Sequence, residues 1–236
     1  LNAMPVQASS GSMGGSASIE FMVPSPAGED DVLRCPNCGY KANVERGTSQ
    51  LAVVVDESGP KEPERFATPG VRSIATLEEI EGGAAAENQI KTMVMVMDEE
   101  VVLALLRGDH QLNLQKLQDY SGAVNIRAAE EAEVISSLGA SPGSLGAVGV
   151  ESLRIIADLA LDGRTNMTTG ANEDDWHLRG VSLGRDIQVD GWADLREVGG
   201  GESCIECGEA LEIVRCIEAG HIFKLGRKYA KAMGVS

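Results

Sequence analysis

The amino-acid sequence predicts a mixed α/β fold, in which helices surround a central β-sheet. Two apolar runs, Lys91–Met97 and Val101–Leu106, flank the polar Asp98-Glu99-Glu100 and are typical of a β-hairpin. Other short apolar runs and helical patterns interleave along the chain without strict βαβ regularity, which favours a mixed sheet. At 236 residues the chain can bury the core of one large domain.

The predicted hairpin is apolar on both faces, because methionine and valine alternate from residue 93 to 97. Strands of this kind lie inside a covered sheet. Lys91 is the exception, since it shares a face with the methionines. It either extends to water at the strand end or contacts an anion inside a pocket.

The remaining elements are short, and their limits follow from capping and stop signals. Thr76 to Glu79 has the spacing of a capping box and predicts a helix start, while Gly139 predicts a helix end. The other expected helices cover 114–119, 128–138 and 227–233, and the other expected strands cover 153–159, 167–171, 176–182 and 211–217.

Composition excludes several classes of function. No run approaches the roughly 20 apolar residues of a membrane span, and no basic segment precedes an apolar one at the N-terminus. We therefore expect a cytoplasmic protein that has no membrane partner. The net charge of -16 argues against autonomous, tight binding of nucleic acid. If the chain handles RNA, other domains must supply most of the affinity.

Four of the five cysteines form two Cys-x-x-Cys-Gly hooks, Cys35/Cys38 and Cys204/Cys207. Two such hooks can close a tetrahedral structural zinc site; the alternative is four reduced thiols in loops. Cys216 lies on an expected strand and is more typical of a small buried hydrophobic residue.

Three further features are weak when taken alone. A glycine-rich loop from Gly143 through Ser144, Leu145 and Gly146 to Ala147 can present backbone N–H groups to a ligand oxygen. His177 follows Trp176 at a strand start, where a lone histidine is more often structural. Asp158 ends an apolar run and is likewise more often a simple strand-end carboxylate.

Taken together and in order, the segments resemble the editing insertion of bacterial-type prolyl-tRNA synthetases. The motifs are GGSAS (14–18), EFMV (20–23), GEDD (28–31), ANVE (42–45), TPG (68–70), IKT (90–92), RGDHQLN (107–113), PGSLGAV (142–148), GANEDDWH (170–177), DLR (194–196) and IEAGHIFKLGRKY (217–229). The resemblance covers nearly the whole chain.

The resemblance implies a prolyl-tRNA editing-domain-like fold at residues 26–215. Residues 1–25 and 216–236 would be flanks of the class II catalytic domain. The implied activity is hydrolysis of alanine mischarged onto tRNA(Pro), with the alanine-carrying acceptor end and the rest of the synthetase chain as partners. ATP and magnesium would serve the full-length synthetase alone, which would be a homodimer. No ligase activity is expected from this fragment.

The resemblance also implies residue roles. Lys91 matches the family's editing lysine, which meets a phosphate or the terminal adenosine, His177 a histidine shaping the small amino-acid pocket, and Asp158 a carboxylate of the same site. The loop Gly143–Ala147 matches the family's G-x-x-x-P loop, which lines the substrate, although Ala147 replaces its proline.

The implied chemistry is attack of water on the aminoacyl ester, assisted by the ribose hydroxyl of the tRNA, because no serine or cysteine nucleophile with a paired base is evident. Size would exclude proline from a pocket fitted to alanine. The departure at Ala147 leaves an alternative open: a module that binds the acceptor end without catalysis, or a structural insertion whose editing has decayed.

Overall fold

The computed structural model describes residues 2–9, 11 and 16–235 and divides into two compact units. One, the barrel unit, comprises Leu1–Ala52 and Glu197–Ser236, and the other, the sheet unit, comprises Val53–Arg196. Both limits expected for the editing domain, 25/26 and 215/216, fall inside the barrel unit. Gly14 and Gly15, the first residues of the GGSAS motif, lie outside the described residues.

The barrel unit is a closed five-stranded barrel built from both ends of the sequence. Its strand order is β1 (Met4–Gln7), β2 (Ser18–Pro24), β13 (Glu212–Phe223), β3 (Asp30–Arg34) and β4 (Lys41–Asn43), and β4 closes it against β1. The sequence predicted the start of β13 but ended it six residues early, at 217. A short helix, α4 (Lys228–Ala232), follows β13.

The sheet unit is organised around the predicted hairpin, which is confirmed. β6 (Ile90–Met97) and β7 (Glu100–Arg107) are antiparallel, and Asp98 and Glu99 turn between them with positive φ. The full order of this sheet is β12 (Gly191–Ala193), β9 (Arg154–Asp158), β7, β6 and β8 (Ile126–Ala128). Because β7, β9 and β12 are parallel, the sheet is mixed, and the mixed α/β fold is confirmed.

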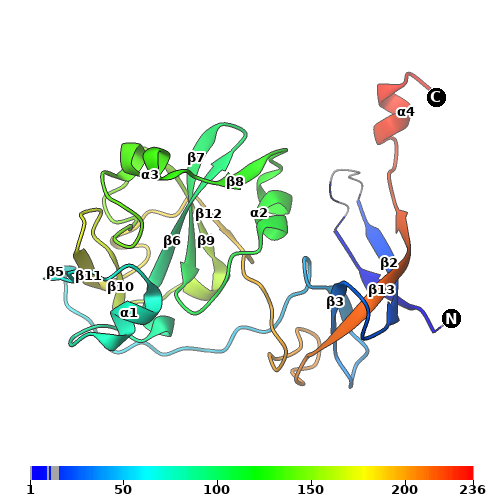
Figure 1. Ribbon diagram of the computed structural model, residues 1–236, viewed down its shortest axis with the longest axis horizontal. Coiled ribbons are helices and arrows are strands. Elements are labelled where there is room, and N and C mark those ends of the chain that lie inside the picture. Colours follow the sequence, from blue (N-terminus) through cyan, green and yellow to red (C-terminus); the bar gives the residue numbers. More distant parts are fainter. Residues whose placement is uncertain (1, 10, 12–15, 236) are drawn as a thin grey trace. The chain divides into compact units, whose positions relative to one another are not determined.

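Each face of this sheet buries its own apolar cluster, as the two-faced pattern of the hairpin predicted. Leu117 of α2 (Leu114–Ser121) packs with Met95 and Met97 on one face. Val134 of α3 (Glu131–Leu138) packs with Leu103 and Leu105 on the other. Figure 1 shows α2 and α3 on opposite sides of the sheet.

A second, three-stranded sheet packs against the first, because Met167 and Val181 belong to the same apolar cluster as Leu103 and Leu105. Its order is β10 (Met167–Gly170), β11 (Trp176–Val181) and β5 (Glu64–Ala67). The chain leaves β5 through Thr68 and enters α1 (Ile74–Glu79). Two short 3₁₀ helices, η2 (Ala86–Asn88) and η3 (Leu159–Leu161), complete the unit.

Two helix starts differ from the predictions. α1 begins at Ile74 because Ser73, not Thr76, is its N-cap; Thr76 is the third helical residue and completes the capping box with Ser73. The helix expected from 128 begins at Glu131, since residues 126–128 extend as β8 beside β6. Among the described residues, no helix is long and apolar enough to cross a membrane.

Candidate functional site

A cavity of about 460 Å³ lies in the sheet unit where its two sheets and the loop before α1 meet. Its wall comes from five parts of the chain that are far apart in sequence. They are 72–75 with Leu77 of α1, 89–93 at the start of β6, Gly108 and Gln111 after β7, Pro142, Gly143 and Leu145, and 168–170 with His177 on β10 and β11. Lys91, His177 and Gly143, which the sequence singled out separately, therefore share one cavity.

Lys91 is held at the cavity wall by a backbone acceptor. Its Nζ donates to the carbonyl oxygen of His110 at 2.5 Å. Burial lowers the pKa of Lys91, and the negative charge of Asp109 partly opposes this effect. The side chain is only partly buried. The ammonium is therefore held by one hydrogen bond and remains within reach of a ligand.

His177 is buried, and both sides of its ring are in contact with the loops around the cavity. Its Nδ1 lies 2.6 Å from the hydroxyl of Thr68, which directly follows β5. Burial lowers the pKa of His177; a hydrogen bond with the backbone of Gly143 opposes the shift, and the charge of Arg72 adds to it. The lowered pKa favours the neutral imidazole, which lines the cavity as a polar group.

The glycine-rich loop rests directly on the end of β10. A Cβ on Gly170 would lie 2.2 Å from the carbonyl carbon of Ser144, and one on Gly146 would lie 2.0 Å from the carbonyl oxygen of Gly170. The backbones can approach this closely because neither residue has a side chain. The N–H of Gly170 also donates to the carbonyl oxygen of Leu145.

The expected loop residues divide into two groups. Gly143 and Leu145 line the cavity. Ser144, Gly146 and Ala147 do not: the Ser144 hydroxyl accepts from the N–H of Asp175, and the Gly146 N–H donates to the Asn172 side chain. Ala147 packs into the apolar core. The family proline position is thus a core position here.

Asp158, which we expected in the same site, lies behind the cavity wall and does not line it. Its carboxylate accepts from the N–H groups of Leu195 and Ala160, and burial raises its pKa. His110 lies between Asp158 and Lys91. Its Nδ1 is 4.0 Å from Asp158 Oδ1, and its carbonyl oxygen accepts a hydrogen bond from Lys91.

The sequence analysis missed three residues of the site: Thr68, Arg72 and Gln89. The side-chain nitrogen of Gln89 donates to the carbonyl oxygens of Ile74 and Ala84, which fixes the loop that enters and leaves α1. The TPG motif contained Thr68, but nothing in its spacing indicated a contact with His177, which is 109 residues away.

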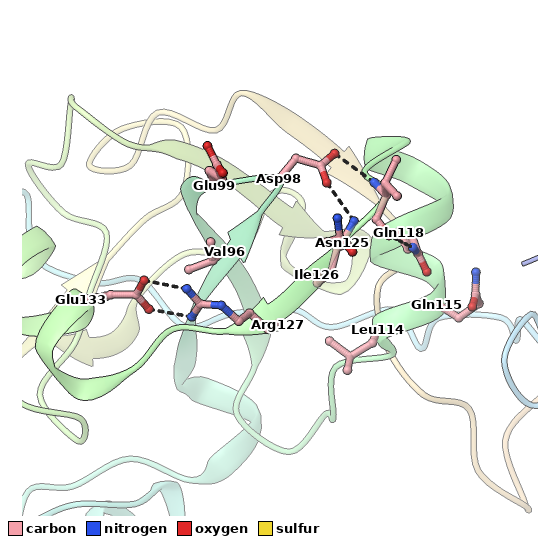
Figure 2. Close-up of a pocket in the computed structure, with 11 residues that line it drawn as sticks. Val96, Asp98, Glu99, Leu114, Gln115, Gln118, Asn125, Ile126, Arg127 and Glu133 are labelled. Atoms are coloured by element: carbon pink, nitrogen blue, oxygen red, sulfur yellow. Dashed lines mark hydrogen bonds and ion pairs between the residues drawn. The ribbon is translucent and has the colours of Figure 1, made fainter. Parts of the chain in front are cut away.

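A second hollow, of about 810 Å³, lies over β8 and α2 and is drawn in Figure 2. None of the predicted site residues lines it. Figure 2 shows Arg127 and Glu133 joined by two contacts, both of 2.7 Å, and the carboxylate of Asp98 accepting from backbone N–H groups. Because Lys91, His177 and Gly143 share the smaller cavity and none of the predicted site residues lines this hollow, the smaller cavity is the better candidate.

The four hook cysteines meet in the barrel unit. Their sulfur atoms all lie within 4.8 Å of one another, with 3.5 Å between Cys35 and Cys207 and 3.7 Å between Cys38 and Cys204. A tetrahedral zinc ion with Zn–S bonds of about 2.3 Å separates its sulfurs by about 3.8 Å. The cluster therefore fits such an ion.

The backbone around Cys35 favours its thiolate, which is the form that binds metals. A hydrogen bond from the backbone of Cys38, followed by one from Asn37, lowers the pKa of the Cys35 thiol to about 7, against the opposing effect of burial. Cys216 is buried in the other apolar cluster of the barrel unit, as its sequence pattern predicted.

Comparisons with known proteins place the chain among editing domains. A proline--tRNA ligase of an Anaeromyxobacter species is 50% identical over 99% of this chain. One from Geotalea daltonii is 45% identical over 97% of it. The chain spans 41% and 40% of the length of these two relatives.

A solved structure described as a proposed trans-editing enzyme for prolyl tRNA synthetase has a TM-score of 0.50 and 22% identity. The matched region covers 58% of this chain and 87% of the chain in that structure. This similarity supports the fold alone. The sequence model of the family described as aminoacyl-tRNA editing domain matches residues 68–187. These residues lie entirely within the sheet unit and contain the whole cavity wall. The resemblance to the editing domain of bacterial-type prolyl-tRNA synthetases is thereby confirmed, and the chain belongs to the aminoacyl-tRNA editing domain family.

Proposed function

We propose that the sheet unit hydrolyses the ester between alanine and the 3′ end of tRNA(Pro). The observation that supports this most strongly is the shared cavity of Lys91, His177 and the Gly143 loop. An ammonium, a neutral imidazole and an open backbone segment suit an aminoacyl ester, which combines a carbonyl group with a charged nucleotide.

The size of the cavity suits this substrate. At about 460 Å³ it falls within the range of roughly 300–1,000 Å³ typical of small-molecule sites. It is much larger than an alanyl group and has room for the ribose that carries the ester. We propose that selection against proline occurs locally, where the buried His177 ring limits the space for the amino-acid side chain.

In the proposed reaction, the oxygen of a water molecule bonds to the ester carbonyl carbon, and the bond from that carbon to the ribose oxygen breaks. The proton of the water passes to the ribose oxygen, and the adjacent ribose hydroxyl assists. The products are alanine and a free 3′ end. N–H groups of the glycine-rich loop would stabilise the developing oxyanion.

The N–H groups of Gly143 and Leu145 are the available donors in this loop. Ser144 N–H donates to Ser141 and Gly146 N–H to Asn172, whereas among the described residues no acceptor is recorded for Gly143 or Leu145. Lys91 would orient the substrate, since an ammonium fixed by His110 adds a positioned charge. Asp158 would not contact the substrate. It would help to position His110 and the backbone at Leu195.

Deacylation of alanyl-tRNA(Pro) by the purified chain tests this proposal. We expect hydrolysis well above the buffer rate, and loss of that hydrolysis in Lys91→Ala with an unchanged circular dichroism spectrum. Lys61→Ala, which removes an exposed lysine of the same unit, should keep the wild-type rate. Binding of the tRNA without hydrolysis by the wild type would favour the non-catalytic alternative.

We also propose that Cys35, Cys38, Cys204 and Cys207 bind one structural zinc ion. Four thiolates leave no position open for water or substrate, so the ion would stabilise the fold and take no part in hydrolysis. It would join the turn between β3 and β4 to the loop before β13, at the small apolar cluster of Leu33, Val198 and Leu211.

The remaining proposals concern the longer protein that the curated relatives represent. This chain spans only about two fifths of their length, so we propose that further domains hold the body of the tRNA and supply the ATP- and magnesium-dependent ligase site. We propose the cytoplasm as the location and a homodimer as the assembly of that longer protein. The net charge of -16 supports the need for other RNA-binding domains.

A further inference from the structure

The cavity has a second cation, Arg72, whose environment differs from that of Lys91. Both line the cavity. The Lys91 ammonium donates one of its three N–H groups to the carbonyl oxygen of His110, and its side chain is partly buried. The Arg72 side chain is 47% exposed, so its guanidinium lies where the cavity meets solvent.

Arg72 is held in place by contacts that use one of its three nitrogens. Nη1 donates to Asp175 Oδ1 at 2.8 Å and to the carbonyl oxygen of Val71 at 2.9 Å. Asp175 is itself fixed, because the same carboxylate oxygen accepts from the N–H of Gly70 at 2.9 Å. Among the described residues, no partner is recorded for Nε or Nη2, so this edge of the guanidinium keeps its donors.

Two observations place Arg72 close to the proposed reaction centre. A Cβ on Gly143 would lie 2.8 Å from both Cα and Cδ of Arg72, so the arginine stem packs directly on the glycine-rich loop. The positive charge of Arg72 is also close enough to His177 to lower the pKa of that ring. Arg72 therefore lies beside the two groups between which the ester would sit.

We propose that Arg72 binds the phosphate on the 5′ side of the substrate's terminal nucleoside and so positions the ester in the cavity. This inference rests on the proposed deacylase function. A guanidinium with a free edge matches two phosphate oxygens, which an ammonium cannot do. When the ester of the terminal nucleoside lies near His177, the RNA chain must run out of the cavity through its mouth. The phosphate on the 5′ side of that nucleoside then lies at the cavity mouth.

The ion pair with Asp175 is compatible with this role. It is exposed on both sides, at 47% and 44%, and exposed pairs contribute little stability. The pair orients the guanidinium and leaves its second edge for the ligand. In a chain with a net charge of -16, a single well-placed cation has a large effect on the local attraction of phosphate.

Two small substrates separate a phosphate contact from a structural role. One is 3′-O-alanyl adenosine, and the other is the same ester with a 5′ phosphate. For the full chain we expect a higher kcat/KM on the phosphorylated ester, mainly through KM. In Arg72→Ala this preference should disappear, with a loss of about tenfold to hundredfold on the phosphorylated ester and little change on the other.

Arg127→Ala is the matched control. Arg127 is also half-exposed, at 52%, and paired with a carboxylate, but it lines the other hollow. It should leave both rates unchanged. Arg72→Lys should restore only part of the preference, because lysine offers a point charge in place of the planar fork.

The possible failures are distinguishable. An equal loss on both esters in Arg72→Ala would overturn the proposal and make Arg72 a structural latch, and an unchanged preference would overturn it as well. If the wild type cleaves neither ester nor alanyl-tRNA(Pro), the proposed function fails. Affinities of the non-hydrolysable 3′-alanylamido analogues, with and without the phosphate, then still test whether Arg72 contacts it.

Discussion

The hydroxyl of Thr68 lies 2.6 Å from Nδ1 of His177, so a residue just after β5 fixes the imidazole that β11 presents to the cavity. Both residues are buried. The backbone supports the same arrangement, because the N–H of Thr68 donates to the carbonyl oxygen of Asp175, two residues before the histidine. Thr68 is therefore a positioning residue for His177.

We predict that Thr68→Val lowers deacylation about tenfold or more while the chain stays folded. Valine has the shape of threonine but leaves the buried imidazole nitrogen without its partner, at a cost of about 1–3 kcal/mol. Thr68→Ser keeps a hydroxyl and should restore most of the rate. If serine and valine reduce kcat equally, the hydroxyl has no positioning role.

The acid side of the stability profile should depend on His177. Burial, together with the charge of Arg72, lowers the pKa of His177 below its ordinary value of 6.5. As pH falls through this value, the unfolded chain binds the proton before the folded chain does, so the stability from the neutral ring is lost as pH falls further through the folded pKa. Stability from this group is fully present above pH 6.5.

Thermal unfolding between pH 5 and 8 checks this expectation. Wild-type Tm should fall more steeply on the acid side of about pH 6.5 than the Tm of His177→Ala, because the variant lacks the titrating group. Parallel curves for the two proteins would show that His177 is not buried in its neutral form.

Gly143→Ala should impair hydrolysis more than it impairs folding. Gly143 has a φ of +113°, and a Cβ there would be 2.8 Å from Arg72 atoms, so the loop and the arginine must separate. Gly149→Ala is the matched control, because Gly149 also has a positive φ, of +74°, but has open space around it. Alanine at Gly149 should cost about 1–2 kcal/mol of stability from its left-handed φ, and alanine at Gly143 should cost more, because its Cβ also meets the backbone of Arg72.

Measured kcat on alanyl-tRNA(Pro) separates the two glycines. We expect a large loss for Gly143→Ala and a near-normal rate for Gly149→Ala. Equal rates for both variants would mean that the contact between the loop and Arg72 does not matter for the reaction.

Removal of zinc should destabilise the barrel unit selectively. We expect about one zinc per chain by elemental analysis, and a lower Tm of the barrel unit after chelation or in Cys38→Ser, since a structural ion contributes folding free energy directly. Cys216→Ala should retain the metal, because Cys216 lies in a different apolar cluster from the four hook cysteines. Metal-free wild-type protein with an unchanged Tm would contradict the zinc proposal.

The sequence predicted those parts of the fold that a local pattern determines. The β6–β7 hairpin was predictable because both runs are apolar on both faces and a polar turn separates them. The short strands β5 and β12 were not, since ERFA and GWA have no apolar alternation. Their conformation depends on pairing with β11 and β9.

The division into units was also beyond local patterns. The barrel forms because β13 pairs with β2 and β3, some 200 residues away in sequence, and neither end of the chain predicts the other by composition. The resemblance predicts domain limits at 25/26 and 215/216 from motifs, whereas contacts divide the chain into two units at 52/53 and 196/197.

The candidate site shows the same limit. The motifs predicted Lys91, His177 and Gly143, which line one cavity, and also Asp158, whose carboxylate accepts from Leu195 and Ala160 and does not line it. The direction of a strand-end side chain depends on tertiary hydrogen bonds. Arg72 and Thr68 were missed for the same reason, since their roles come from contacts with Asp175 and His177.

The most direct test of the account compares alanyl-tRNA(Pro) and prolyl-tRNA(Pro) as substrates of this chain under single-turnover conditions. The account predicts rapid release of alanine, prolyl-tRNA(Pro) that stays intact, and cleavage of the prolyl ester once His177→Ala enlarges the pocket. Release of both amino acids at the same rate by the wild type, or of neither, would contradict it.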